Sequence, residues 1–244
     1  MPNVKVTLEY DGTDFRGFQK QPSVRTVQGE LERALGKLLS RTDARVIGAG
    51  RTDAGVHATG QVINLEAGSF PVDRIVPAMN GLLPASIRAR AAEEVPDDFH
   101  ARYSAKARTY IYVVLNRSVP SALLARYAWH LVQPLDIEVM KRAASELIGT
   151  HDFSSFGVPE KAGGSTIRQL HELSICRRRD EIVLRVRANA FLRGMVRAMV
   201  GTLAEVGQGR REPLEVAAIL RAGNRQAAGK SAPPEGLYLV RVEY

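Results

Sequence analysis

The sequence predicts an α+β fold made of two ferredoxin-like (split βαβ) halves, residues 1–104 and 105–244. Patterns in the first half predict the order strand, helix, strand, strand, helix, strand, and patterns in the second half predict the same order again. This repetition indicates an internal duplication. The two half-sheets are predicted to join edge to edge, giving one continuous mixed or antiparallel sheet with helices on one face and a central cleft.

In the first half, strands are predicted where apolar and polar residues alternate or where a short apolar run occurs, at residues 4–10, 45–47, 61–65 and 87–95. Helices are predicted where apolar residues recur three and four positions apart, at residues 26–39 and 72–83. Thr26 is suited to cap the first of these helices, and Leu82 is expected on the inward face of the second.

In the second half, the same patterns predict strands at residues 107–115, 170–176, 182–188 and 236–244. Helices are predicted at residues 136–148 and 191–206, the first of them capped by Asp136 and followed by Gly149. Pro213 and Gly223 mark the start and end of an added helix.

The net charge of the chain is +8, and the whole excess lies in the second half. Residues 1–104 hold 13 basic and 13 acidic side chains, whereas residues 105–244 hold 21 basic and 13 acidic ones. This asymmetry suggests a polyanion that docks mainly on the second half, although a solvated basic face explains the charge equally well. With no bilayer-spanning apolar run and no signal-peptide pattern, we expect a cytoplasmic protein without a membrane segment.

Residues 48–60 are the stretch least typical of ordinary structure, because glycines at positions 48, 50, 55 and 60 surround Arg51 and Asp53. Asp53 has three interpretations: a turn residue, a metal or phosphate ligand, or a catalytic carboxylate. A nearby guanidinium keeps a carboxylate ionised, which favours catalysis by a nucleophile. His57 is assigned no role, since a single histidine at the start of a strand is more often a hydrogen-bonded structural group.

Two residues of the second half are candidates for binding. Tyr110 is either a half-buried sheet tyrosine or an aromatic platform for an RNA base. Arg197 lies beside the apolar stripe of the predicted 191–206 helix, one turn from Arg193, and either pairs with an anion such as Asp53 or extends to solvent. Further arginines form a solvated basic surface that is also a candidate to face RNA: Arg177, Arg178, Arg179, Arg185 and Arg187.

Motifs along the whole chain resemble the bacterial tRNA pseudouridine synthase A family. In chain order they are Tyr10–Thr13, Phe15–Gln19, Gly50–His57, Phe99–Arg102 leading to Tyr110, His151–Phe156, Phe191–Leu192, Met195–Arg197, Gly201–Leu203 and Pro233–Leu239. The resemblance implies isomerisation of uridine to pseudouridine at positions 38, 39 and 40 of the tRNA anticodon stem-loop. It also implies a homodimer that needs no cofactor and no metal.

The resemblance also implies roles for individual residues. Asp53 is implied to be the catalytic nucleophile on a flipped-out uridine, and Arg197 to pair with it. Tyr110 is implied to stack on the target uracil and is a candidate to take the proton from C5, while Arg51 helps to displace the target nucleotide. The glycines around Asp53 are then expected to let the RNA backbone approach closely.

Two other functions are weighed against the synthase. A non-catalytic tandem RNA-binding module of ferredoxin-like units predicts exposed aromatics in paired central-strand motifs, which are not evident in the sequence. A metal-dependent phosphohydrolase predicts a set of metal ligands, and the sequence around Asp53 does not supply one.

Overall fold

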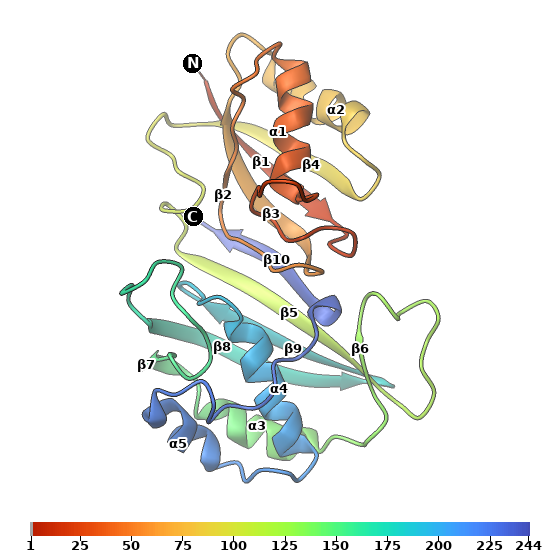
Figure 1. Ribbon diagram of the computed structural model, residues 1–244, viewed down its shortest axis with the longest axis vertical. Coiled ribbons are helices and arrows are strands. Elements are labelled where there is room, and N and C mark those ends of the chain that lie inside the picture. The colour runs from red at the N-terminus through yellow and green to blue at the C-terminus, as the bar shows by residue number, and fades with distance from the viewer. Residues whose placement is uncertain (1) are drawn as a thin grey trace. The chain divides into compact units, whose positions relative to one another are not determined.

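The structure is a computed structural model that describes residues 2–244, and it divides into two compact units (Figure 1). Unit 1 comprises the residues up to Lys106 together with Tyr238–Tyr244, and unit 2 comprises Ala107–Leu237. The last strand, which the sequence places in the half 105–244, therefore belongs to the compact unit of the first half. Among residues 2–244, no helix has the length and apolar character that crossing a membrane requires.

Unit 1 has the strand order of a split βαβ fold, with one modification. Its elements are β1 (Asn3–Tyr10), α1 (Val27–Leu38), β2 (Ile47–Gly48), β3 (His57–Glu66), α2 (Val72–Leu82), β4 (Ile87–Val95) and β10 (Leu237–Glu243). β4, β1 and β3 are antiparallel neighbours in that order. β2 pairs with one end of β3, at Asn64, and β10 runs parallel to the other end, at His57.

The core of unit 1 follows the sequence periodicity. Alternate side chains of β1 are fully buried, and the inward face of α1 is buried at the predicted positions Val27, Leu31 and Leu35. Thr26 caps α1, because its Oγ1 accepts a hydrogen bond from the Gly29 N–H at 3.2 Å. The helices α1 and α2 contact each other, and α2 packs against β4 (Figure 1).

Unit 2 is also built from an antiparallel sheet and helices, but its element order departs from that of unit 1, because three strands lie between its first two helices. Its elements are β5 (Ala107–Asn116), β6 (Trp129–Leu131), α3 (Ile137–Ser145), β7 (Gly149–Asp152), β8 (Ile167–Arg178), β9 (Glu181–Ala188), α4 (Met195–Gly207), α5 (Glu215–Ala222) and the 3-10 helix η1 (Pro234–Gly236). The strand order is β5-β9-β8-β7 with antiparallel pairs, and β6 runs parallel to β5. The α+β class is confirmed.

Several boundaries differ from the predictions for physical reasons. The predicted 191–206 helix begins only at Met195, because Gly194 takes a left-handed conformation (φ +76°) and Arg193 forms an antiparallel bridge with Val158. Arg193 is therefore outside the helix that carries Arg197. The predicted 136–148 helix, which Asp136 does cap, ends at Ser145 and tightens into turns whose N–H groups reach back three residues.

Other differences concern unit 1 and two short strands. The predicted strand 45–47 shrinks to Ile47–Gly48, while the strand after the glycine-rich stretch begins four residues early, at His57. Leu82 is exposed instead of inward. Because α2 ends there and the backbone at Leu83 is extended, the Leu83 side chain, not that of Leu82, enters the core. The sequence patterns do not predict β6 and β7.

Candidate active site

Asp53 lies in a short loop between β2 and β3, and its side chain is half-buried. The loop is attached to the preceding polar segment by backbone hydrogen bonds: the Phe18 N–H donates to the Thr52 carbonyl (3.0 Å) and the Gly55 N–H to the Phe15 carbonyl (3.4 Å). The Val56 N–H donates to the Asp53 carbonyl (3.1 Å), which closes a turn through backbone groups. Arg51 lies on the same loop and is exposed.

A buried polar network of side chains holds this loop against the sheet. The hydroxyls of Tyr10 and Thr52 are 2.8 Å apart, and both side chains are buried. The Gln61 amide nitrogen donates to the Gly50 carbonyl at 2.9 Å and lies 3.4 Å from the Tyr10 hydroxyl. Burial raises the pKa of Tyr10 to about 12, and the hydrogen bonds with Thr52 and Gln61 oppose that rise. Both neighbours of Arg51 are thereby anchored to strands of the sheet.

His57 is a structural group in unit 1, in agreement with the interpretation from sequence. Its ring is 2% exposed and stacks on Tyr238 with a centroid separation of 4.9 Å. The Gly12 N–H donates to Nδ1 at 3.0 Å, so Nδ1 carries the lone pair. Asp11 Oδ1 also lies 3.1 Å from Nδ1, but a direct bond between these two atoms requires protonation of Nδ1.

The glycines around Asp53 have reasons within the protein. A Cβ at Gly48 would lie 2.4 Å from the Phe18 ring, and one at Gly60 would lie 2.2 Å from the Val240 carbonyl oxygen of β10. Gly55 has a φ of +78°, which disfavours any residue with a side chain. Packing explains Gly48 and Gly60 and backbone conformation explains Gly55, so the approach of RNA is not needed to account for these three glycines.

In unit 2, Tyr110 lies on β5 and Arg197 on the first turn of α4. The Tyr110 side chain is 8% exposed, and its ring packs edge-on against Phe191 with centroids 5.0 Å apart. Arg197 is half-buried, and its Nε donates to the Ala232 carbonyl at 2.7 Å. Tyr112 lies two residues after Tyr110 on β5. Its hydroxyl donates to the carbonyl of Pro233, the residue after Ala232, at 2.8 Å.

These contacts join β5 and α4 through one segment of chain. Burial raises the pKa of Tyr112 strongly; Glu235 adds to the rise, and Arg197 opposes it. Arg197 is thus close enough to Tyr112 to influence it electrostatically. Unit 1 therefore presents Arg51 and Asp53 on one loop, and unit 2 presents Tyr110 and Arg197 on elements that the chain around Ala232 holds together.

A separate hollow in unit 1 has a volume of about 710 Å³ and does not include the Asp53 loop. Asn3, Arg41, Asn64 and His100 are among its lining residues. Asn3 begins β1, whereas Tyr10 ends it beside Thr52, so this hollow lies at the other end of the strand.

Comparison with known proteins identifies the family. The family model described as tRNA pseudouridine synthase matches residues 7–104 and 143–244. The chain belongs to the tRNA pseudouridine synthase family. It is therefore an enzyme of an isomerase family.

Individual relatives match over nearly their full length. The tRNA pseudouridine synthase A of Halalkalibacterium halodurans is 48% identical over 97% of this chain and 90% of that protein. The protein of the same name from Moorella thermoacetica is 48% identical over all of both chains. A crystal structure of an archaeal box H/ACA sRNP Nop10–Cbf5 complex aligns with a TM-score of 0.37 and 11% identity, covering 82% of this chain and 44% of that one. That structural alignment is too weak to support an argument.

Both segments that the synthase family model matches contain candidate residues: Arg51 and Asp53 lie in the first, Arg197 in the second, while Tyr110 lies between them. The sequence patterns do not reveal the hydroxyl pair beneath the loop or the role of the chain around Ala232. One signal for the latter is present, since two prolines and a glycine at Pro233, Pro234 and Gly236 mark a special backbone path.

Proposed function

We propose that this synthase isomerises uridine to pseudouridine at positions 38, 39 and 40 of the tRNA anticodon stem-loop. Family membership supports the reaction, and the relatives named tRNA pseudouridine synthase A support the tRNA substrate. The observation that carries the assignment of the reaction centre is the Arg51–Asp53 loop. Its backbone is fixed by buried polar groups, while Asp53 itself stays half-buried and thus accessible.

The reaction is a redox-neutral rearrangement. The bond between uracil N1 and the ribose C1′ breaks, the base turns, and a bond forms between C5 and C1′; C5 loses a proton and N1 gains one. A nucleophile and a proton acceptor suffice for these steps. We assign the nucleophile to the carboxylate of Asp53, which attacks either the uracil ring or C1′ in this proposal.

Binding roles are proposed for the other three residues. The target uridine must leave the base stack before its ring or ribose can be attacked, and Arg51 is exposed on the catalytic loop, where it can take the vacated place. Tyr110, its ring fixed by Phe191, stacks on the uracil and is a candidate to accept the C5 proton. The positively charged guanidinium of Arg197 stabilises negative charge on the reacting groups.

The charge distribution supports docking of tRNA mainly on unit 2. Residues 107–237 carry 19 basic and 12 acidic side chains, and arginine suits phosphate recognition because its planar fork binds two oxygens. We further propose that the enzyme acts as a homodimer in the cytoplasm.

Release of tritium from tRNA labelled at uracil C5 tests the reaction and the role of Asp53 together. Wild-type protein is expected to release tritium, and Asp53→Asn to release none while binding tRNA with an unchanged Kd. Asp73→Asn is the matched control, because Asp73 is an exposed carboxylate in the first turn of α2. Tritium release by Asp53→Asn would overturn the assignment of the nucleophile.

The same measurement separates the enzyme from a non-catalytic RNA-binding module. If the wild-type protein binds tRNA but releases no tritium from any tRNA pool, the binding module is the correct function. If it releases tritium and loses no activity in the presence of a chelator, a metal-dependent phosphohydrolase is excluded as well.

A further inference from the structure

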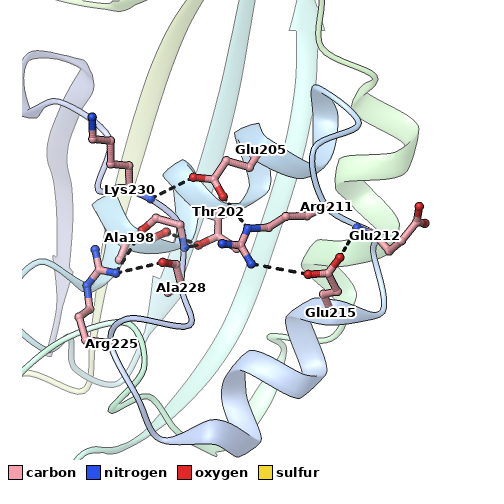
Figure 2. Close-up of polar contacts among 10 residues, drawn as sticks. Ala198, Thr202, Glu205, Arg211, Glu212, Glu215, Arg225, Ala228 and Lys230 are labelled. Carbon is pink, nitrogen blue, oxygen red and sulfur yellow. Dashed lines mark hydrogen bonds and ion pairs between the residues drawn. The ribbon is translucent and has the colours of Figure 1, made fainter.

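Residues 228–233, here called the strap, run alongside α4 and are attached to it at several points (Figure 2). The Gly229 N–H donates to Thr202 Oγ1 at 2.9 Å, and the Lys230 N–H donates to Glu205 Oε1 at 3.1 Å. Thr202 Oγ1 in turn donates to the Ala198 carbonyl, so its orientation is fixed. Side chains of one helix therefore accept successive N–H groups of the strap.

Gly201 allows the strap to come this close to the helix. A Cβ at this position would lie 1.7 Å from the Lys230 carbonyl oxygen and 3.1 Å from the Ala232 nitrogen. Glycine within a helix ordinarily costs about 1 kcal/mol relative to alanine. Its presence in the middle of α4 is explained by the contact between two backbones.

Two arginines also stabilise the strap, Arg211 through Glu205 and Arg225 by direct hydrogen bonds. Arg211 Nε donates to Glu205 Oε2 at 2.5 Å, and its Nη1 lies 3.6 Å from Glu215 Oε2 on α5, so Glu205 is held in the position that receives the Lys230 N–H (Figure 2). Arg225 donates to the Gly229 carbonyl at 3.1 Å and to Ser231 Oγ at 2.8 Å.

The strap ends on the proposed substrate-binding arginine. The Ala232 N–H donates to the Arg197 carbonyl at 2.9 Å, and the Arg197 Nε donates back to the Ala232 carbonyl at 2.7 Å. Gly201, Thr202 and Glu205 lie on the same helix, roughly one and two turns beyond Arg197. Thr202 and Glu205 thus hold the strap at Gly229 and Lys230, just before Ala232, and Gly201 leaves room for the backbone between them.

We propose that Gly201, Thr202 and Glu205 are positioning residues: they seat the strap so that the Ala232 carbonyl orients the Arg197 guanidinium for the reaction. This proposal rests on the substrate-binding role of Arg197 given above. Arginine has a planar fork whose Nε and Nη groups share one plane, so a bond at Nε fixes the direction in which the remaining donors point. A shift of the strap is thus transmitted to the atoms that meet the substrate.

A purely structural role of the strap would lead to different results. If the strap only covers the core, damage to its seat lowers the stability of unit 2, and activity falls with the fraction of folded protein. If the strap orients Arg197, kcat falls in fully folded protein while the KM for tRNA is little changed, because one misplaced group affects the reaction more than the many phosphate contacts.

The first experiment uses Gly201→Ala, with Gly81→Ala as the matched control. Gly81 is also a helical glycine, but an added Cβ there meets no atom within 4 Å. We expect Gly201→Ala to lower kcat by about 10- to 100-fold with an unchanged KM, measured below the onset of thermal unfolding. Gly81→Ala should keep full activity. Wild-type kcat in folded Gly201→Ala would overturn the proposal.

The second experiment uses a partly exposed position whose variants are expected to fold. Glu205→Ala removes the acceptor for the Lys230 N–H, whereas Glu205→Gln keeps an oxygen there. We expect Glu205→Ala to lower kcat by about 10-fold and Glu205→Gln to restore most of it. Faster amide exchange at Lys230 and Ala232 in Glu205→Ala would report the loosened strap directly, and unchanged exchange would contradict it.

Combination with Arg197→Lys decides whether the effect passes through Arg197, because lysine lacks the Nε–H that bonds Ala232. The proposal predicts that Glu205→Ala causes no further loss of kcat in the Arg197→Lys background. An equal fold-loss in both backgrounds would show a structural role and overturn the proposal. If Arg197→Lys and Arg197→Ala both retain wild-type kcat, the proposed role of Arg197 fails as well. The assignment of Asp53 is judged separately by tritium release.

Discussion

The Asp53 loop of unit 1 and the Arg197 region of unit 2 hold their candidate residues in different ways. The loop is held directly by buried groups of unit 1: the Tyr10, Thr52 and Gln61 side chains and the backbone of residues 15–18. Arg197 stands on a regular helix, and its side chain is oriented by a carbonyl 35 residues away in the chain.

This difference shows where each unit is sensitive. In the loop, position depends on buried hydrogen bonds and close backbone contacts, so a substitution of these supporting groups should affect stability and activity together. Around Arg197, position depends on a second segment seated on the helix. A substitution at Glu205, the partly exposed position of that seat, should affect activity more than stability.

Among substitutions that test this difference between the units, Gly12→Ala is expected to have the largest effect. A Cβ at Gly12 would lie 2.0 Å from the Val56 carbonyl oxygen, and the Gly12 N–H is the donor to His57. We expect a loss of about 3 kcal/mol in the free energy of unfolding together with loss of tritium release. Urea unfolding measures the first quantity. A stable but inactive Gly12→Ala would contradict the coupling of stability and activity in the loop.

A smaller and pH-dependent effect is expected from Tyr10→Phe. Near pH 8 the variant should lose about 1 kcal/mol, because the hydrogen bond with Thr52 is gone. The folded protein holds the Tyr10 pKa at about 12, above the ordinary value of 10.0, so the unfolded chain gives up this proton first. Stability attached to Tyr10 is thus complete below pH 10 and is lost as the pH rises from 10 to 12.

The wild type should therefore lose up to about 3 kcal/mol more than Tyr10→Phe over that pH range. Chemical unfolding of both proteins at several alkaline pH values measures the difference. Parallel pH dependence in the two proteins would show that Tyr10 ionises freely and does not anchor the loop.

The smallest effect is expected at exposed arginines and compares the two units as RNA-binding surfaces. Arg178→Ala on β8 should weaken tRNA binding only a few-fold and reduce the slope of log Kd against log salt by about 1. Arg74→Ala on α2 of unit 1 is the control and should leave the slope unchanged. Equal changes in both variants would contradict preferential docking on unit 2.

The sequence predicts the features of unit 1 whose determinants are local. The alternation of β1, the Thr26 cap and the Arg51–Asp53 spacing are all visible within single segments. The interpretation of the glycines was incomplete for the opposite reason: Gly48 and Gly60 face Phe18 and Val240, which are distant in sequence. The hydroxyl pair of Tyr10 and Thr52 is hidden for the same reason.

The start of α4 and the strap could not be predicted from periodicity. The apolar run Phe191–Leu192 fits the helical pattern of α4. The left-handed Gly194 and the bridge from Arg193 to Val158 nevertheless prevent the helix from beginning before Met195. The strap has no periodic pattern at all, and its position follows from contacts with α4 that only the folded chain brings together.

We propose that the chemistry resides on the Asp53 loop and acts on the anticodon stem-loop. Position-resolved mass spectrometry of an unmodified tRNA transcript, after incubation with saturating enzyme, tests it most directly. We predict pseudouridine at positions 38, 39 or 40 with the wild type, and none with Asp53→Asn at an equal fraction of bound tRNA. Pseudouridine at these positions with Asp53→Asn, or only at other positions with the wild type, would contradict the claim.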